Sequence, residues 1–219
     1  MQIVLSHNVT SSFTFLDAFE AWLNQCAMSA SIPAEDDGAY LAVEMTLIDA
    51  ARSGDEDAYR QLLEQFQPTI STQMRRFSHD RAVVENLVHD VFVEAFMSLK
   101  SFKGRSPFEH WLRKIAVRVG YRHWKTEALD KRRLAQLCKE HKRALKFSEP
   151  PADAIDAQEQ LHIMLAKLGP RDRLVLTLLY WDGHSVAEAA KLAGWTQAMV
   201  KVQAHRARKK LKKLLEESQ

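Results

Sequence analysis

SVAEAAKLAGWTQAMVKVQAHRARKKL, from Ser185 to Leu211, is the stretch that decides the fold of this 219-residue chain. Ser185 and Glu188 have the spacing of a helix-capping box, and Gly194 is suited to end the helix that they start. Thr196 is suited to cap a second helix directly afterwards. Two helices joined by so tight a turn predict a helix-turn-helix unit, which places its second helix in the major groove of DNA.

The helix predicted after Thr196 divides into an apolar stripe and a polar surface. The stripe that is expected to pack inward consists of Val200, Ala204, Ala207, Leu211 and Leu214. Ala190 supplies a small residue where the two helices cross. Seven Lys or Arg residues lie between Lys201 and Lys213, with no acid among them. We therefore assign contacts with DNA phosphates and base edges to Thr196, Gln197, Lys201, Gln203, His205, Arg206 and Arg208.

This basic end has two other interpretations. A helical hairpin with a charged, solvated face has the same pattern and stays open. A helix on a membrane surface is disfavoured, because Ala204 and Ala207 are too small for strong insertion.

The composition, with 46% hydrophobic and 27% charged residues, is typical of a soluble globular protein. No apolar run approaches the roughly 18 to 20 residues needed to cross a bilayer, and the N-terminus lacks the pattern of a secretory signal. Cys26 and Cys138 offer no disulfide framework. We therefore expect a cytoplasmic protein without membrane insertion.

The net charge of +3 conceals a strong asymmetry along the chain. Residues 1–99 carry 5 basic and 15 acidic side chains, whereas residues 100–146 carry 15 basic and 4 acidic ones. Residues 147–219 carry 11 and 9. This distribution indicates a polyanionic partner for the middle segment and a different partner for the acidic segment. The alternative is that two charged faces attract each other within one fold.

Apolar residues recur mostly at helical spacing, and the chain has only 7 Gly and 6 Pro, so we expect an all-α protein. Breaks between helices are predicted at 53–55, Pro68, 78–80 and 103–107. The stretch KFSEPPAD (146–153) belongs to a flexible linker, because its Pro-Pro pair cannot lie inside a helix. Two small helical domains follow from this, divided as an N-terminal extension (1–44), a first domain (45–133), the linker (134–157) and the helix-turn-helix domain (158–219).

The basic middle of the chain mixes cations with aromatic rings. These residues are Phe102, Lys103, Arg105, Phe108, Trp111, Arg113, Lys114, Arg118, Tyr121, Arg122, Trp124 and Lys125. Cations that follow phosphates, with rings available for unstacked bases, are what binding of a single strand requires. Within this set Trp111 is expected in the core, together with Ile115, whereas Lys103 and Arg105 are expected at the functional surface.

Four stretches, in this order, carry a resemblance to a known family. They are LIDAARSGDEDAYRQLLEQF (47–66), VENLVHDVFVEAF (84–96), FKGRSPFEHWLRKIAVRVGYRHWK (102–125) and LGPRDRLVLTLLYWDGHSVAEAAKLAGWTQAMVKVQAHRARKKL (168–211). Together they resemble bacterial RNA polymerase sigma factors of the small extracytoplasmic-function (ECF) type. The resemblance runs from about Met45 to Leu215.

This resemblance implies that the chain is a transcription initiation factor whose partners are core RNA polymerase and double- and single-stranded promoter DNA. It also implies control by an anti-sigma factor or another regulator. The helix-turn-helix would read the minus-thirty-five element, and residues 208–213 would touch phosphates or polymerase, or be solvated. The loop 102–107 would hold a flipped base of the minus-ten element. The residues that would contact and melt this promoter region are Lys103, Arg105, Arg113, Lys114, Arg118, Tyr121 and Arg122.

The stretch 84–99 would contact the clamp of the polymerase. Its contact residues would be Glu85, Asn86, His89, Asp90 and Glu94. The apolar side that packs inward would be Leu87, Val88, Val91, Phe92, Ala95 and Leu99. The chain departs from the family here and in the melting region. It has Val83, Asn86 and His89 where the family usually has Asp and Gln, and Val117-Arg118 where the family commonly has Arg-Asn.

No catalytic residue, cofactor or metal site is predicted. Cys138 and His141 have helical spacing, but two ligands do not make a zinc site. The chain has no glycine-rich phosphate loop, so we expect no nucleotide binding. Two alternatives remain beside the sigma factor. One is a helix-turn-helix regulator with an N-terminal sensor domain, and the other is a nucleic-acid-processing enzyme, disfavoured because no carboxylates cluster.

Residues 1–44 precede the resemblance and contain an amphipathic stretch at 13–28. Its apolar face would dock onto the first domain, mask a polymerase or DNA surface, or bind a regulator. A start codon placed too early would leave it without meaning.

Overall fold

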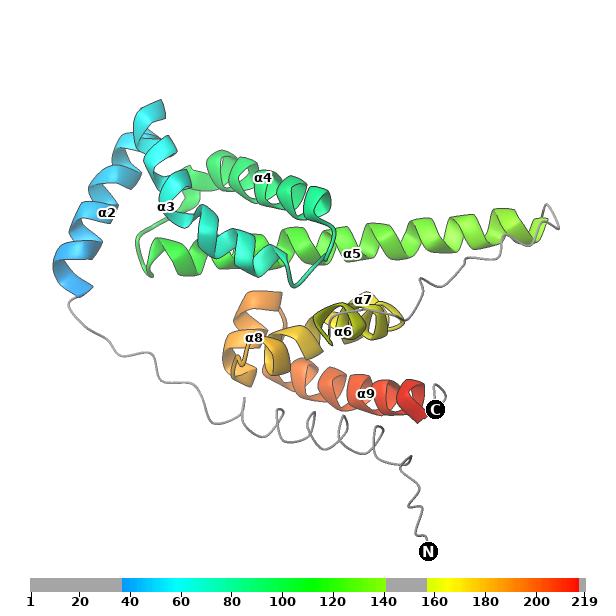
Figure 1. Cartoon of the computed structure of the whole chain (residues 1–219). Helices are drawn as coiled ribbons and strands as arrows, with labels where there is room; N and C mark the ends of the chain where they lie inside the picture. Colours follow the sequence, from blue (N-terminus) through cyan, green and yellow to red (C-terminus); the bar gives the residue numbers. More distant parts are fainter. Residues whose placement is uncertain (1–36, 141–156, 217–219) are drawn as a thin grey trace, which may run out of the picture.

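The computed structural model describes residues 37–140 and 157–216. Every regular element in these ranges is a helix (Figure 1), which confirms the predicted all-α class. The predictions for the stretch 13–28, for the Pro-Pro pair at 150–151, for His141 and for the Cys138 side chain lie outside the described residues.

The N-terminal helices form one bundle. They are α2 (Asp37–Arg52), α3 (Glu56–Met74), α4 (Arg81–Ser98), the short 3-10 helix η1 (Leu99–Ser101) and α5 (Phe108–Glu140). α3 packs against α2, α4 and α5, and α4 packs against α5. The far end of α5 extends beyond this bundle (Figure 1). α5 therefore includes residues that the sequence assigned to the linker, and α2 begins within the predicted extension.

Side-chain caps start the helices at the predicted breaks. Asp55 accepts hydrogen bonds from the backbone N–H groups of Asp57 and Ala58, both at 3.0 Å, and so caps α3. Asp80 caps α4 in the same way, with the N–H of Ala82 at 2.8 Å. The breaks at 53–55, 78–80 and 103–107 are confirmed.

The break predicted at Pro68 is wrong, because α3 continues through it. Pro68 removes the N–H that would bond to the carbonyl of Glu64, but both residues are exposed, so water replaces the missing bond. The buried residues of this helix are Ala58, Leu62, Phe66, Ile70 and Met74. Since all five recur every four positions, on both sides of Pro68, burial holds both halves of the helix on the core.

The C-terminal helices form a second unit, with α6 (Ala157–Ala166), α7 (Pro170–Leu176), the π-helical turn η2 (Thr177–Trp181), α8 (Val186–Ala193) and α9 (Gln197–Glu216). Ser185 and Glu188 form the predicted capping box, and Gly194 ends α8 with a φ of +69°. The Thr196 hydroxyl accepts a hydrogen bond from the N–H of Met199 at 3.2 Å and caps α9. The predicted helix-turn-helix is therefore formed by α8 and α9.

The apolar stripe of α9 packs inward as predicted. Val200, Ala204, Ala207 and Leu211 are buried, and Leu214 is partly buried against the same core. Ala190 of α8 is also buried. α9 packs on α7 and α8, so one side of the helix is fixed and the other is left for solvent or a partner.

The two units touch, because α7 and α8 pack on α5 (Figure 1). Arg76, which follows α3, joins them through two contacts with the C-terminal unit. Its Nε donates to a carboxylate oxygen of Asp182 at 3.1 Å, and its guanidinium lies over the Trp181 ring, 4.9 Å from the centroid. An open groove of about 490 Å³ lies beside this pair.

A second arginine, from the C-terminal unit, joins that unit to the N-terminal bundle. The Arg173 guanidinium of α7 lies over the Trp124 ring of α5, 4.1 Å from its centroid, and 3.8 Å from the carboxylate of Glu127. The Trp124 ring is fixed in turn, because its Nε1–H donates to the carbonyl of Phe77 at 2.8 Å. Each unit therefore places an arginine on a tryptophan and beside an acid of the other.

Candidate nucleic-acid interface

The side of α9 opposite its buried stripe presents the residues predicted to contact DNA. The exposed members of this set are Thr196, Gln197, Lys201, His205, Arg206 and Arg208. The cations stand on the face that the packing against α7 and α8 leaves uncovered. This is the arrangement by which a recognition helix brings cations to phosphates and polar tips to base edges.

Gln203 lies differently from the rest of the set. It is only partly exposed, and its amide Nε2 donates to a carboxylate oxygen of Asp172 at 2.5 Å. The other oxygen of Asp172 pairs with Lys210 Nζ at 2.6 Å. Asp172 is buried in α7, so these two contacts tie α9 to α7 and turn the Gln203 amide toward the protein.

The predicted melting residues lie on α5 and on the loop before it. Lys103, Arg105, Lys114, Arg118 and Arg122 are exposed. Arg113 and Tyr121 are partly buried. Arg113 pairs with Glu109 at 2.7 Å, and the Tyr121 ring meets the edge of Trp195, with their centroids 6.2 Å apart. The exposed cations form a basic surface along α5, but Tyr121 lies at the contact with the C-terminal unit.

The rings expected to receive unstacked bases are mostly buried, which corrects the prediction. Phe102, Phe108 and Trp124 are each at most 3% exposed. Phe102 and Phe108 pack on each other and on Trp111, at centroid distances of 5.3 to 5.4 Å. Ile115 is buried as predicted, and Trp111 is partly buried against the core. These rings serve the core here, where Phe108 also packs on Phe66 of α3 and Trp124 packs on Phe77.

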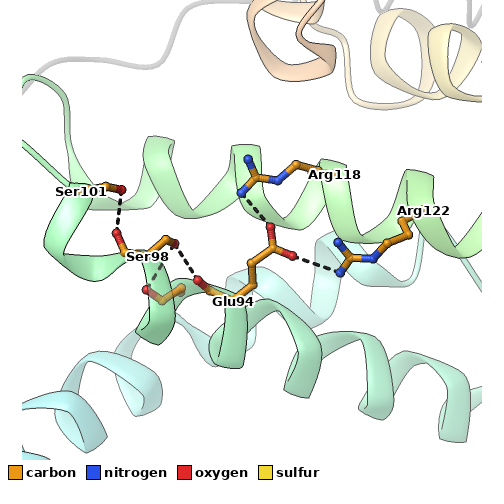
Figure 2. Close-up of polar contacts among 6 residues, drawn as sticks. Glu94, Ser98, Ser101, Arg118 and Arg122 are labelled. Atoms are coloured by element: carbon orange, nitrogen blue, oxygen red, sulfur yellow. Dashed lines mark hydrogen bonds and ion pairs between the residues drawn. The ribbon is translucent and has the colours of Figure 1, made fainter.

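Glu94 connects the two helices that the sequence assigned to different partners (Figure 2). One carboxylate oxygen lies 2.8 Å from Arg118 Nη2, and the other lies 3.0 Å from Arg122 Nη2. The hydroxyl of Ser98, one turn further along α4, donates to the Glu94 backbone carbonyl at 2.6 Å. The acid assigned to polymerase therefore faces the arginines assigned to DNA.

The remaining residues assigned to polymerase share the outer face of α4. Glu85, Asn86, His89 and Asp90 are exposed, and Glu85 also pairs with Arg81 at 2.8 Å. The predicted inward side, Leu87, Val88, Val91, Phe92, Ala95 and Leu99, is buried. Sequence reasoning missed three large apolar residues on the same helix, Val93, Phe96 and Met97, which are 42%, 55% and 71% exposed. Their positions outside the inward-facing stripe of the helix could have indicated their exposure from the sequence.

Burial lowers the pKa of two side chains at the contact between the units. Burial lowers the pKa of Arg173 to about 10, although the nearby Glu127 carboxylate opposes this. Burial, and then the charges of Arg173 and His79, lower the pKa of His162 to about 4. Arg173 Nη2 lies 3.4 Å from His162 Nδ1, so this nitrogen accepts a hydrogen bond and the imidazole is neutral. The guanidinium stays charged between a ring and a neutral histidine.

Within residues 37–140 and 157–216 no group of three or more His, Cys, Asp or Glu side chains is arranged to hold a metal ion. No helix of the described ranges is both long and apolar enough to cross a membrane. The uncovered cations of α9 and α5 form basic surfaces, and with the helix-turn-helix they define a DNA-binding protein.

Comparison with known proteins gives the family. The family model for sigma-70 region 2 matches residues 62–129, and the model for sigma-70 region 4 matches residues 158–211. These two models together cover more than half of the chain, which therefore belongs to the sigma-70 family of RNA polymerase sigma factors and is of the ECF type. The match of the N-terminal domain to region 2 disfavours the alternative of a regulator with a sensor domain.

Individual relatives agree with this family. RNA polymerase sigma factor YlaC of Bacillus subtilis is 28% identical over 170 residues, which are 76% of this chain and 95% of that protein. The ECF RNA polymerase sigma-E factor of Escherichia coli is 26% identical over 175 residues, which are 75% and 90%. Among solved structures, that of CnrH in complex with the cytosolic domain of CnrY has a TM-score of 0.52 and 26% identity, and the match covers 80% of this chain and 99% of that chain.

Proposed function

We propose that three surfaces of this chain divide the work of transcription initiation. α9 reads the upstream promoter element, α5 and the loop before it contact the DNA that is melted, and the outer face of α4 binds core RNA polymerase. The observation that carries the proposal is the row of uncovered cations on α9, opposite a buried apolar stripe and behind a capped turn. The chain itself performs no catalysis in this scheme, and it acts in the cytoplasm, together with the polymerase.

The upstream element is assigned to α9 because its free side chains have the chemistry of groove recognition. Arg206 and Lys201 donate to phosphates or guanine edges, and Gln197 and His205 are exposed for base edges. Gln203 is left out of the assignment, since its amide bonds to Asp172.

The melted strand is assigned to the loop 102–107 and α5. Lys103 and Arg105 stand exposed before the start of α5, and Lys114, Arg118 and Arg122 continue the row of cations along it. Since the rings of this segment are mostly buried, the cations provide most of the contact with the strand, through its phosphates.

Transcription with purified core polymerase tests the whole proposal. The chain is expected to co-elute with the core enzyme and to start transcripts at a defined subset of sites on genomic DNA of the same organism. Arg206→Ala is expected to abolish most of these starts and to leave co-elution unchanged, whereas Lys191→Ala, which removes an exposed cation of α8, changes neither. A chain that binds DNA but neither co-elutes nor starts transcripts would contradict the proposal.

The melting role has a separate test. The double variant Lys103→Ala/Arg105→Ala is expected to reduce the permanganate reactivity of promoter thymines several-fold while the affinity for core polymerase stays the same. Unchanged reactivity would remove the loop from the melting surface.

A protein regulator is part of the proposal as well. The similarity to CnrH, whose structure was solved with the cytosolic domain of CnrY, supports a protein partner for this chain too. An anti-sigma factor is the expected kind of partner. Affinity purification of the tagged chain from its own cells, with and without added core polymerase, tests whether a second protein competes with the polymerase for it.

A further inference from the structure

The Glu94 carboxylate stands below two guanidinium groups that face solvent (Figure 2). Its side chain is 21% exposed, whereas those of Arg118 and Arg122 are 60% and 57% exposed. The two arginines are four residues apart on α5 and therefore lie on the same side of that helix. One oxygen of Glu94 bonds to each of them. The acid thus lies on the protein side of the pair and the cations on the solvent side.

This arrangement leaves the arginines able to bind an anion. A guanidinium has five N–H donors, and the contact with Glu94 uses one Nη2 from each arginine. The group of three side chains keeps a net charge of +1. Without the carboxylate, two like charges one helical turn apart would repel each other, and two long side chains would spread over many rotamers.

We propose that Glu94 is a positioning residue that holds Arg118 and Arg122 as a preformed cradle for backbone phosphates of the unpaired promoter strand. The ligand class is a phosphodiester of single-stranded DNA. The proposal deepens the proposed function and rests on it, because it requires α5 to touch DNA. Glu94 is in this view part of the DNA surface and not of the polymerase surface to which its helix otherwise belongs.

Charge and positioning predict opposite effects of removing Glu94. A variant with one acid less has a more positive surface, and charge alone therefore predicts tighter binding of a polyanion. Positioning predicts weaker binding, because both arginines must then be ordered by the DNA itself. Weaker binding without Glu94 thus indicates positioning, and tighter binding indicates an effect of charge alone. Tighter binding is also expected if Glu94 competes with phosphate for the arginines.

The test is binding of a fluorescent 20-nucleotide oligothymidine by the full-length chain. This probe presents phosphates without any promoter sequence. Glu94→Gln, which keeps the size of the side chain, is expected to weaken binding about three- to tenfold. Asp57→Asn is the matched control, because Asp57 is an exposed acid that also pairs with an arginine, Arg60, at 2.6 Å, and no DNA contact is assigned to either. This control is expected to bind as the wild type does or slightly more tightly.

A double-mutant cycle completes the experiment. In the background Arg118→Ala/Arg122→Ala, Glu94→Gln is expected to cause no loss of affinity, and at most slightly tighter binding from the lost charge. A merely structural role of Glu94 would lower affinity there too. Equal or tighter binding by Glu94→Gln alone overturns the positioning role. If the double arginine variant also binds as the wild type does, the assignment of α5 to DNA fails instead. Circular dichroism of each variant verifies that it is folded.

Discussion

The guanidinium of Arg173 lies over the ring of Trp124, 4.1 Å from its centroid, and joins the helix-turn-helix unit to α5. A cation on a ring that is 2% exposed has lost most of its water, so its attraction to the ring exceeds that of an exposed pair. The pair of Arg76 with Trp181 repeats this relationship in the opposite direction. Two charged side chains on rings, with the acids beside them, are therefore part of the contact between the units, as is the Tyr121–Trp195 pair.

Loss of Arg76 is expected to destabilise the contact between the units. Arg76→Ala leaves the mostly buried carboxylate of Asp182 without its cation, which costs about 1 to 3 kcal/mol. Chemical denaturation measures this free energy, and energy transfer between dyes on the two units measures their separation. Arg60→Ala, which breaks an exposed ion pair with Asp57, is the control and is expected to change stability by less than about 1 kcal/mol. The same loss in both variants would contradict the prediction.

Acid is expected to weaken the folded state through His162. The ordinary histidine pKa of 6.5 falls to about 4 at this position, so between these values the unfolded chain binds a proton that the folded chain does not. The contribution of His162 is therefore fully present above about pH 6.5 and is lost as the pH falls toward 4, by about 3 kcal/mol. Denaturation of wild type and His162→Gln across this range measures the difference.

Neighbouring groups act on this titration from both units. Arg173 lies against the ring from α7, and Arg76 and His79 face it from the N-terminal bundle. Asp182 has the opposite pH dependence. Burial raises the pKa of its carboxyl group, so the folded chain takes up a proton there at a higher pH than the unfolded chain does, and this favours folding as the pH falls. Asp182 is present in both the wild type and His162→Gln, so its contribution to stability cancels in the difference between their curves. The control variant His205→Gln, at an exposed position, is expected to reproduce the wild-type curve. Parallel curves for wild type and His162→Gln would exclude this role.

Gly120→Ala is expected to destabilise the first domain, although alanine normally favours a helix by about 1 kcal/mol. A Cβ at this position would overlap the Phe77 ring, which itself packs on Trp124. The expected loss is about 1 to 3 kcal/mol, measured by thermal or chemical unfolding. In the Gly120→Ala variant, the further change Phe77→Leu is expected to cost less stability than it costs in the wild type, because the smaller side chain relieves the overlap. A more stable Gly120→Ala variant would disprove the close packing.

Met97→Asp is expected to lower the affinity for core polymerase about tenfold without a loss of stability. Met97 is the most exposed of the large apolar residues of α4, and it belongs to the same helix as the exposed Asn86 and Asp90. Leu129→Asp is the matched control, because Leu129 is an exposed apolar residue of α5 with no assigned contact. Binding of labelled core enzyme measures both. Equal affinities would show that the polymerase uses a different surface.

Local sequence patterns predicted the helices and their ends well. The capping box of Ser185 and Glu188, the turn at Gly194 and the cap at Thr196 each depend on residues a few positions apart, and the structure forms all of them. Pro68 was misjudged because its cost depends on whether the freed carbonyl meets water, and the burial pattern around it decides this.

Contacts between distant residues were beyond the sequence. Nothing in the spacing of Glu94 and Arg118 shows that α4 and α5 lie side by side, so an acid on the polymerase helix was assigned to polymerase alone. The rings of Phe102 and Trp124 could not be divided into core and surface for the same reason. The structure does explain one departure from the family: Val117 is buried in the core, whereas Arg118 next to it pairs with Glu94.

The contact of Tyr121 with Trp195 limits the length of promoter DNA that one molecule can span. These two rings, 6.2 Å apart, belong to the segment assigned to the minus-ten element and to the turn before the helix assigned to the minus-thirty-five element. Elements 25 base pairs apart are separated by about 85 Å of duplex, at roughly 3.4 Å per base pair. One molecule cannot span that length while the two rings touch. Reading both elements thus requires the two units to part, and the loss of the arginine–tryptophan pairs contributes to the energy of that step.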